Sequence, residues 1–191
     1  MRPFRRPLGV RAVAGLTLGA LVGAACGGNN PQSAPAAPAT DVTAAVGSTG
    51  SDAAMAFAEV FATTTTLDGD AFDGATLAGI DAVVWFWAPW CTICRAEAPD
   101  VAEIAERYAE QVTFIGVPGR GQLAAMREFV DDTGTSTLLH AADLDGSVWS
   151  AFGVYGQPAY AFIDDTGEIE VFIGGMGGRA LAKRVDALVA T

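Results

Sequence analysis

The chain has 191 residues, of which 51% are hydrophobic, and a formal net charge of −11 at pH 7. This length allows one domain with a sizeable core and a tail. Acidic residues outnumber basic ones by 22 to 11, which argues against nucleic acid as a partner because phosphate binding needs a surplus of lysine and arginine.

The N-terminal segment, residues 1–26, has the order of charge and hydropathy that is typical of an export signal. Residues 1–11 carry four arginines and no acidic residue, and residues 12–25 form an apolar run. A run of this length is too short to cross about 30 Å of hydrocarbon as a helix. We therefore expect a signal peptide over residues 1–26 and an extracytoplasmic location for the rest of the chain.

Residues 21–28, around Cys26, resemble a lipoprotein cleavage box, in which the cysteine becomes the lipid-modified N-terminus. Ala24 and Ala25 supply the small residues before the cleavage point. Without a lipid, Cys26 would be an unpaired thiol in an exported protein whose other two cysteines form a pair. The resemblance implies lipidation at Cys26 and a chain anchored to the cell membrane. The alternative is ordinary cleavage and a secreted soluble protein.

A segment of low complexity follows the signal. Residues 27–52 are rich in Ala, Pro, Gly, Ser, Thr and Asn and lack apolar periodicity, which predicts a flexible linker. We expect the folded domain to occupy residues 53–191. Loss of residues 1–26 would remove four arginines and no acid and take the formal charge from −11 to −15.

The centre of the domain is a strand that leads into a cysteine pair. Residues 83–87 form a continuous apolar run typical of a buried strand, and Cys91 and Cys94 follow just before a helical pattern begins. Unpaired N–H groups at a helix start favour a negative sulfur, so the pKa of Cys91 should fall. Cys94 lies one turn further in. The spacing predicts a redox-active pair, since a structural zinc would need about four ligands.

These residues carry a family resemblance. Residues 87–94, Trp-Ala-Pro-Trp-Cys-Thr-Ile-Cys, resemble the W-A-x-W-C-x-x-C signature of thioredoxin-like proteins. Glu97 and Pro99 are similar to the C-x-x-E-x-P continuation of the extracytoplasmic TlpA, ResA and DsbE branch. The resemblance covers about residues 61–190.

The remaining elements follow the same pattern along the chain. We expect a peripheral hairpin near residues 63–67, a short edge strand at 137–139, strands at 112–117, 159–163 and 168–173, and helices at 122–132, 148–152 and 177–190. Residues 53–61 fit either a short helix or an extended lead-in. The order matches an α/β thioredoxin-like fold, a three-layer sandwich with a central mixed sheet flanked by helices.

The resemblance also implies residues that meet a substrate. A cis-proline occupies the place of Pro158 in the thioredoxin fold, and the residue before it, here Gln157, offers backbone hydrogen bonds to an extended substrate. Trp90 adjoins Cys91 and would shield the site or provide an apolar docking surface. Trp85 and Trp87 alternate on a strand and are expected in the core.

Glu97 stands one helical turn from Cys94 and could take the proton of the resolving thiol as a general base. The alternative is an exposed helix glutamate. Thioredoxins proper use a buried aspartate on the central strand for this duty, and that place holds Trp85 here. His140, the one histidine of the chain, is expected as a surface or strand-edge residue.

The function that these residues predict is thiol-disulfide exchange with protein substrates that contain cysteines. Oxidative folding is favoured over a reductase of the cytochrome c maturation type. A membrane or secreted redox partner would recycle the site, and no cofactor or metal is expected. A different class, a copper-binding metallochaperone using Cys91, Cys94 and His140, is the alternative.

Overall fold

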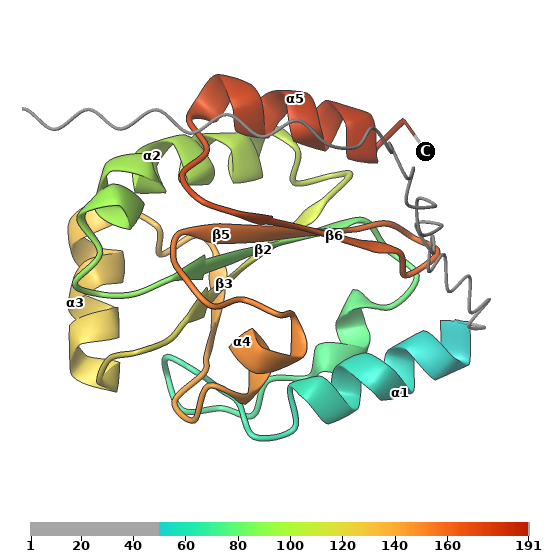
Figure 1. The fold of residues 1–191 in the computed structure, drawn as a ribbon, viewed down its shortest axis with the longest axis horizontal. Helices are drawn as coiled ribbons and strands as arrows, with labels where there is room; N and C mark the ends of the chain where they lie inside the picture. The colour runs from blue at the N-terminus through green and yellow to red at the C-terminus, as the bar shows by residue number, and fades with distance from the viewer. Residues whose placement is uncertain (1–49, 191) are drawn as a thin grey trace, which may run out of the picture. The chain divides into compact units, whose positions relative to one another are not determined.

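The computed structural model describes residues 50–190, which belong to one compact unit, Ala44–Thr191. They form a six-stranded sheet with helices on both faces (Figure 1). The expected signal peptide, Cys26 and most of the expected linker lie outside the described residues. Helix α1 (Gly50–Val60) occupies the segment for which helix and extended lead-in were both open.

The sheet has the strand order β1-β4-β3-β2-β5-β6. Its strands are β1 (Thr65–Thr66), β2 (Ala82–Trp87), β3 (Thr113–Pro118), β4 (Leu139–Ala142), β5 (Ala159–Ile163) and β6 (Ile169–Ile173). The pairs β2·β3 and β3·β4 are parallel, and β1·β4, β2·β5 and β5·β6 are antiparallel. The mixed sheet is therefore confirmed, and β2 lies between a parallel and an antiparallel neighbour at its centre.

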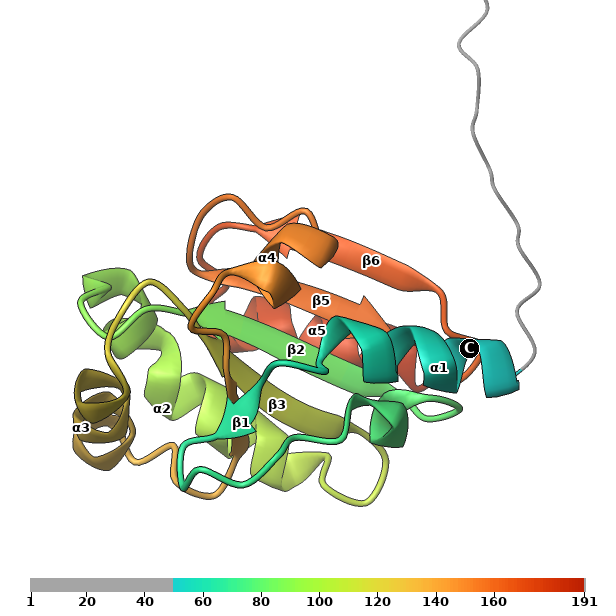
Figure 2. The ribbon, with the colours of Figure 1, turned by 90° about the horizontal axis from the view of Figure 1, so that it is seen from below.

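Alternation along β2 divides the core into two layers, because successive strand residues point to opposite faces. Trp85 and Trp87 pack toward α2 (Thr92–Arg107), α3 (Leu123–Thr133) and α5 (Gly178–Leu188). Val84 and Phe86 pack toward α1, the 3-10 helix η1 (Gly74–Leu77) and α4 (Ser147–Ala151). Figures 1 and 2 show α2 and α5 on one face of the sheet and α1 and α4 on the other. This confirms the three-layer α/β arrangement.

The prediction of an edge strand at 137–139 is wrong both in the residues of the strand and in its place within the sheet. β4 begins at Leu139, where it pairs with Ile115 of β3, and β1 covers its other side, so β4 lies within the sheet. The two-residue strand β1 forms the edge on this side of the sheet. Its chain turns back at once, since Thr66 N–H donates to Asp70 O at 2.7 Å.

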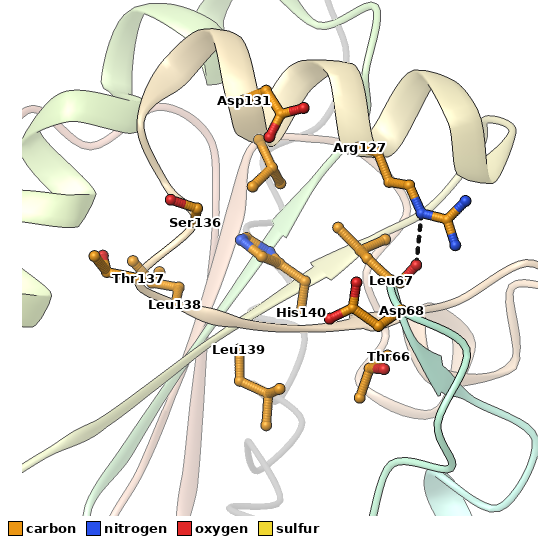
Figure 3. Close-up of a pocket in the computed structure, with 11 residues that line it drawn as sticks. Thr66, Leu67, Asp68, Arg127, Asp131, Ser136, Thr137, Leu138, Leu139 and His140 are labelled. Atoms are coloured by element: carbon orange, nitrogen blue, oxygen red, sulfur yellow. Dashed lines mark hydrogen bonds between the residues drawn. The ribbon is translucent and has the colours of Figure 1, made fainter.

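His140 is buried on β4, with 4% of its surface exposed, where the sequence suggested a surface or strand-edge residue. Its ring packs edge-on against Trp87, and its Nε2 lies 3.0 Å from Thr135 O. Figure 3 shows the side chain among residues 66–68, α3 and 136–140, which line a pocket that contains neither Cys91 nor Cys94. Burial lowers the pKa of His140, because desolvation disfavours the charged ring.

This burial predicts a stability loss on acidification. The unfolded chain holds His140 at its ordinary pKa of 6.5, so it binds the proton first as pH falls. Wild-type stability should therefore drop below about pH 6.5, with a slope of at most about 1.36 kcal/mol per pH unit. In His140→Gln this dependence should vanish. Urea unfolding of both proteins between pH 7.5 and 5 measures this pH dependence. An equal loss of unfolding free energy in wild type and His140→Gln would contradict the prediction.

Candidate active site

The cysteine pair lies where β2 meets α2. β2 ends at Trp87, a turn follows in which Cys91 N–H donates to Ala88 O at 3.0 Å, and Cys91 is the N-cap residue of α2. The first helical hydrogen bond runs from Arg95 N–H to Cys91 O at 3.1 Å. The buried strand thus fixes one end of the turn and the helix fixes the other, which sets Cys91 at the positive end of the helix dipole.

Cys91 and Cys94 form a disulfide with Cα atoms 5.3 Å apart. Cys91 Sγ also accepts a hydrogen bond from Cys94 N–H at 3.0 Å. Cys91 is 6% exposed and Cys94 is fully buried. An incoming thiolate therefore reaches Cys91 first, and the backbone N–H stabilises negative charge on that sulfur when the bond is broken.

Pro158 lies at the same end of the sheet. β5 pairs antiparallel with β2 so that Ala159 is opposite Phe86, which puts the residue before it level with the start of the cysteine turn. The Gln157–Pro158 peptide bond is cis, as the resemblance implied. Pro158 is buried and Gln157 is half-buried.

Glu97 is not an exposed helix residue: it is 9% exposed and faces the core layer that contains Cys94. Tyr160 Oη donates to its Oε2 at 2.9 Å, and the Met176 N–H is a second donor. Burial raises the pKa of Glu97, because desolvation outweighs these hydrogen bonds to the charged form. A carboxyl with a raised pKa is better matched to proton transfer near neutral pH.

A glycine-rich loop, residues 174–178, closes over Glu97. A Cβ on Gly175 would lie 2.6 Å from Glu97 Oε1, closer than any ordinary contact. Gly178 N–H donates to Asp100 Oδ2 at 2.8 Å, which ties the start of α5 to α2. The loop therefore helps keep water from the carboxyl group, while its Met176 N–H stabilises the charged form of Glu97.

The sequence did not indicate Tyr160 as a partner of Glu97, because the two residues are 63 positions apart. Tyr160 is fully buried and pairs with Trp85 across the sheet. The one available signal was its place two residues after Pro158, on a strand next to β2. Burial and the Glu97 carboxylate raise the pKa of Tyr160, so it remains a donor.

Trp90 is 59% exposed beside Cys91, whereas Trp85 and Trp87 are fully buried, as expected. Trp90 Nε1 donates to Arg120 O at 2.9 Å. Arg120, which the sequence did not single out, reaches further to Gln157 Oε1 at 3.3 Å and to Tyr155 O at 2.9 Å. The sequence offers only a weak indication that Arg120 is functional, namely a charged residue between two glycines after a strand.

Within residues 50–190, no group of three or more His, Cys, Asp and Glu side chains is placed to hold a metal ion. His140 Nε2 is already engaged with Thr135 O, so the ligand set of the metallochaperone alternative is not assembled in this part of the chain. In the same residues, no helix has the length and apolar character needed to cross a membrane.

Comparison with known proteins agrees with this site. The Redoxin family model matches residues 35–179. The soluble secreted antigen MPT53 of Mycobacterium tuberculosis is 43% identical over 100 residues, which cover 52% of this chain and 57% of MPT53. The chain thus matches little more than half the length of this curated relative.

Two solved structures are similar over more of their length. MTB dsbF, in its mixed oxidized and reduced forms, is 48% identical with a TM-score of 0.64, covering 68% of this chain and 96% of dsbF. A secreted Mycobacterium tuberculosis disulfide oxidoreductase homologous to E. coli DsbE is 38% identical with a TM-score of 0.63, covering 68% and 98%. The similarity confirms the thioredoxin-like fold and the resemblance of the chain to DsbE-like proteins.

Proposed function

The chain belongs to the Redoxin family, and from this membership we propose that it is a thiol-disulfide oxidoreductase that exchanges the Cys91–Cys94 disulfide with cysteine pairs of exported proteins. One observation carries the proposal: the disulfide sits at the start of α2, with its more exposed sulfur on a backbone N–H donor. A purely structural bridge has no need of that donor or of an accessible sulfur.

The reaction balances as two exchanges. A substrate thiolate attacks Cys91 Sγ, the Cys91–Cys94 bond breaks, and Cys94 leaves as a thiolate. The second substrate thiolate then attacks the substrate sulfur of the mixed disulfide, and Cys91 leaves. The substrate dithiol is oxidised to a disulfide, and the protein disulfide is reduced to a dithiol.

In this scheme Glu97 transfers a proton to and from the Cys94 sulfur. Its carboxyl is one helical turn from Cys94, buried, and held by the Tyr160 hydroxyl. In the acid form it supplies the proton that the departing Cys94 thiolate takes up. In the reverse direction its carboxylate removes that proton, so one group acts as acid and base in turn.

The substrate would bind beside Cys91, on Trp90, Gln157 and the cis-Pro158. Trp90 offers an exposed aromatic face, and the segment before β5 runs next to the end of β2. An extended chain can pair with backbone groups there, with Trp90 as an apolar anchor.

Oxidative folding is the direction we propose. The N–H donor on Cys91 Sγ stabilises the thiolate, and stabilising the reduced form raises the reduction potential. A glutathione equilibrium series tests this by following the reduced fraction of the Cys91–Cys94 pair. A potential above about −180 mV supports an oxidant, and one near about −270 mV supports the alternative, a reductant.

We propose that the protein acts outside the cytoplasm, anchored through a lipid on Cys26. The relative MPT53 is described as a soluble secreted antigen, which supports export and leaves secretion as the alternative. Intact-mass analysis of protein purified from membranes should show cleavage before Cys26 and added acyl mass. A soluble product that lacks Cys26 and carries no modification would disprove the anchor.

A further inference from the structure

The segment 118–121 runs between the cysteine turn and α4 in very close contact with both. A Cβ on Gly121 would lie 2.4 Å from Pro89 Cγ, and one on Gly119 would lie 2.8 Å from the Trp149 indole. Neither space admits a side chain. The two glycines therefore let the backbone of Arg120 approach the turn that carries Trp90.

Arg120 itself adopts a left-handed backbone conformation, which favours glycine. Its φ is +55°, and it is the one non-glycine residue with positive φ among residues 50–190. Such a backbone persists only where surrounding contacts impose it, and it is found preferentially at functional sites. A glycine would fit this backbone without strain, so the fold alone does not account for an arginine.

The side chain shows what the arginine adds. Its guanidinium donates to Tyr155 O and Gln157 Oε1 and stacks 4.9 Å from the centroid of the Trp149 ring, while its carbonyl accepts from Trp90 Nε1. One residue therefore joins the cysteine turn to the cis-proline segment. The planar fork of an arginine can serve two acceptors and stack on an indole at once, which a lysine cannot.

The exposed Trp90 indole and the backbone of Tyr155 are thereby held in one frame. Trp90 is 59% exposed, and its indole is fixed by the hydrogen bond from Nε1 to Arg120 O, whereas Tyr155 accepts from the Arg120 guanidinium through its backbone carbonyl. Exposed aromatic groups of fixed geometry are the usual anchors of a binding surface, because they bury much area with little loss of entropy.

We propose that Arg120 is a positioning residue that fixes Trp90 relative to residues 155–158, so that a substrate polypeptide meets a preformed surface beside Cys91. This inference rests on the proposed thiol-disulfide exchange. It predicts that Arg120 governs the affinity for a polypeptide substrate more than the rate of the exchange step.

The test compares Arg120→Gly and Arg120→Lys with wild type on a peptide that contains a cysteine pair. In Arg120→Gly the carbonyl that accepts from Trp90 remains, and relief of the backbone strain opposes the loss of the guanidinium contacts, so the melting temperature should change little. KM should rise about tenfold through loss of the charged hydrogen bonds, and kcat should change less than about threefold. Arg120→Lys should restore little of the affinity.

Arg107→Ala is the matched control, since Arg107 ends α2, about 24 Å along the helix from Cys91, and its KM should equal that of wild type. Three results would overturn the inference: KM values within twofold of wild type in both Arg120 variants, full rescue by lysine, or a fall in kcat and melting temperature with KM unchanged. If wild type itself exchanges with no peptide, the proposed function fails instead.

Discussion

Replacement of Cys91 by serine is expected to reduce both dithiol oxidation and insulin reduction to the uncatalysed rate. Cys91 is the more exposed sulfur of the pair and the one that accepts the Cys94 N–H, and a serine hydroxyl neither forms a disulfide nor ionises near neutral pH. Cys94→Ser should instead retain the attack of the Cys91 thiolate on a substrate disulfide and accumulate mixed disulfides, because the thiol that would resolve them is gone. Non-reducing gels and mass spectrometry of the trapped species measure this.

Both variants are best made in a Cys26→Ser background, which removes the third cysteine of the chain and is itself the control. Roles are checked by alkylation of the reduced protein at limiting reagent. Cys91 should be modified first. Faster modification of Cys94, or failure of Cys94→Ser to trap a substrate, would reverse the assignment of attacker and resolver.

Glu97→Gln is expected to slow the attack of Cys94 on a Cys91 mixed disulfide by about 10²-fold, while the attack of Cys91 on a substrate disulfide keeps its rate. A glutamine fills nearly the same space and still accepts the Tyr160 hydrogen bond, but it cannot take the Cys94 proton. Stopped-flow tryptophan fluorescence across pH separates the two steps. Glu106→Gln, on the exposed face of α2, is the control and should match wild type.

Tyr160→Phe tests the role of Glu97 as the base for Cys94 through the direction in which the pH dependence shifts. The Tyr160 hydroxyl donates to the charged form of Glu97 and so opposes the rise of its pKa caused by burial. Without that donor the pKa of Glu97 should rise further, and the rising limb of the Cys94 step should move to higher pH. An unchanged limb in Tyr160→Phe, together with wild-type rates in Glu97→Gln, would show that the Cys94 proton leaves through water.

The features that the sequence predicted correctly are local ones. Cys91 and Cys94 are three positions apart and follow a buried strand and a turn, so their geometry is fixed by elements that a short window of sequence contains. The isomer of Pro158 is different, because short-range sequence cannot select cis over trans. That expectation came from the family resemblance.

The features that were missed depend on contacts between distant segments. Glu97 meets Tyr160 across 63 positions, and Arg120 meets Trp90, Tyr155 and Gln157 across 30, 35 and 37. His140 was expected as a surface or strand-edge residue, yet Gly116 on the adjacent strand leaves room for its ring in the core. Tertiary packing, which periodicity does not report, decided each case.

The spacing of the cysteines also determines how little the fold relies on their bond. A disulfide stabilises a protein largely by restricting the unfolded chain, and by the chain-entropy relation a loop this short contributes about 2 kcal/mol, against nearly 5 for a loop of about 100 residues. Cys91 and Cys94 are separated by three positions, and both core layers form without help from a longer covalent loop. Reduction should therefore leave the domain folded, so that each catalytic cycle begins and ends with the same architecture and no refolding step intervenes between turnovers.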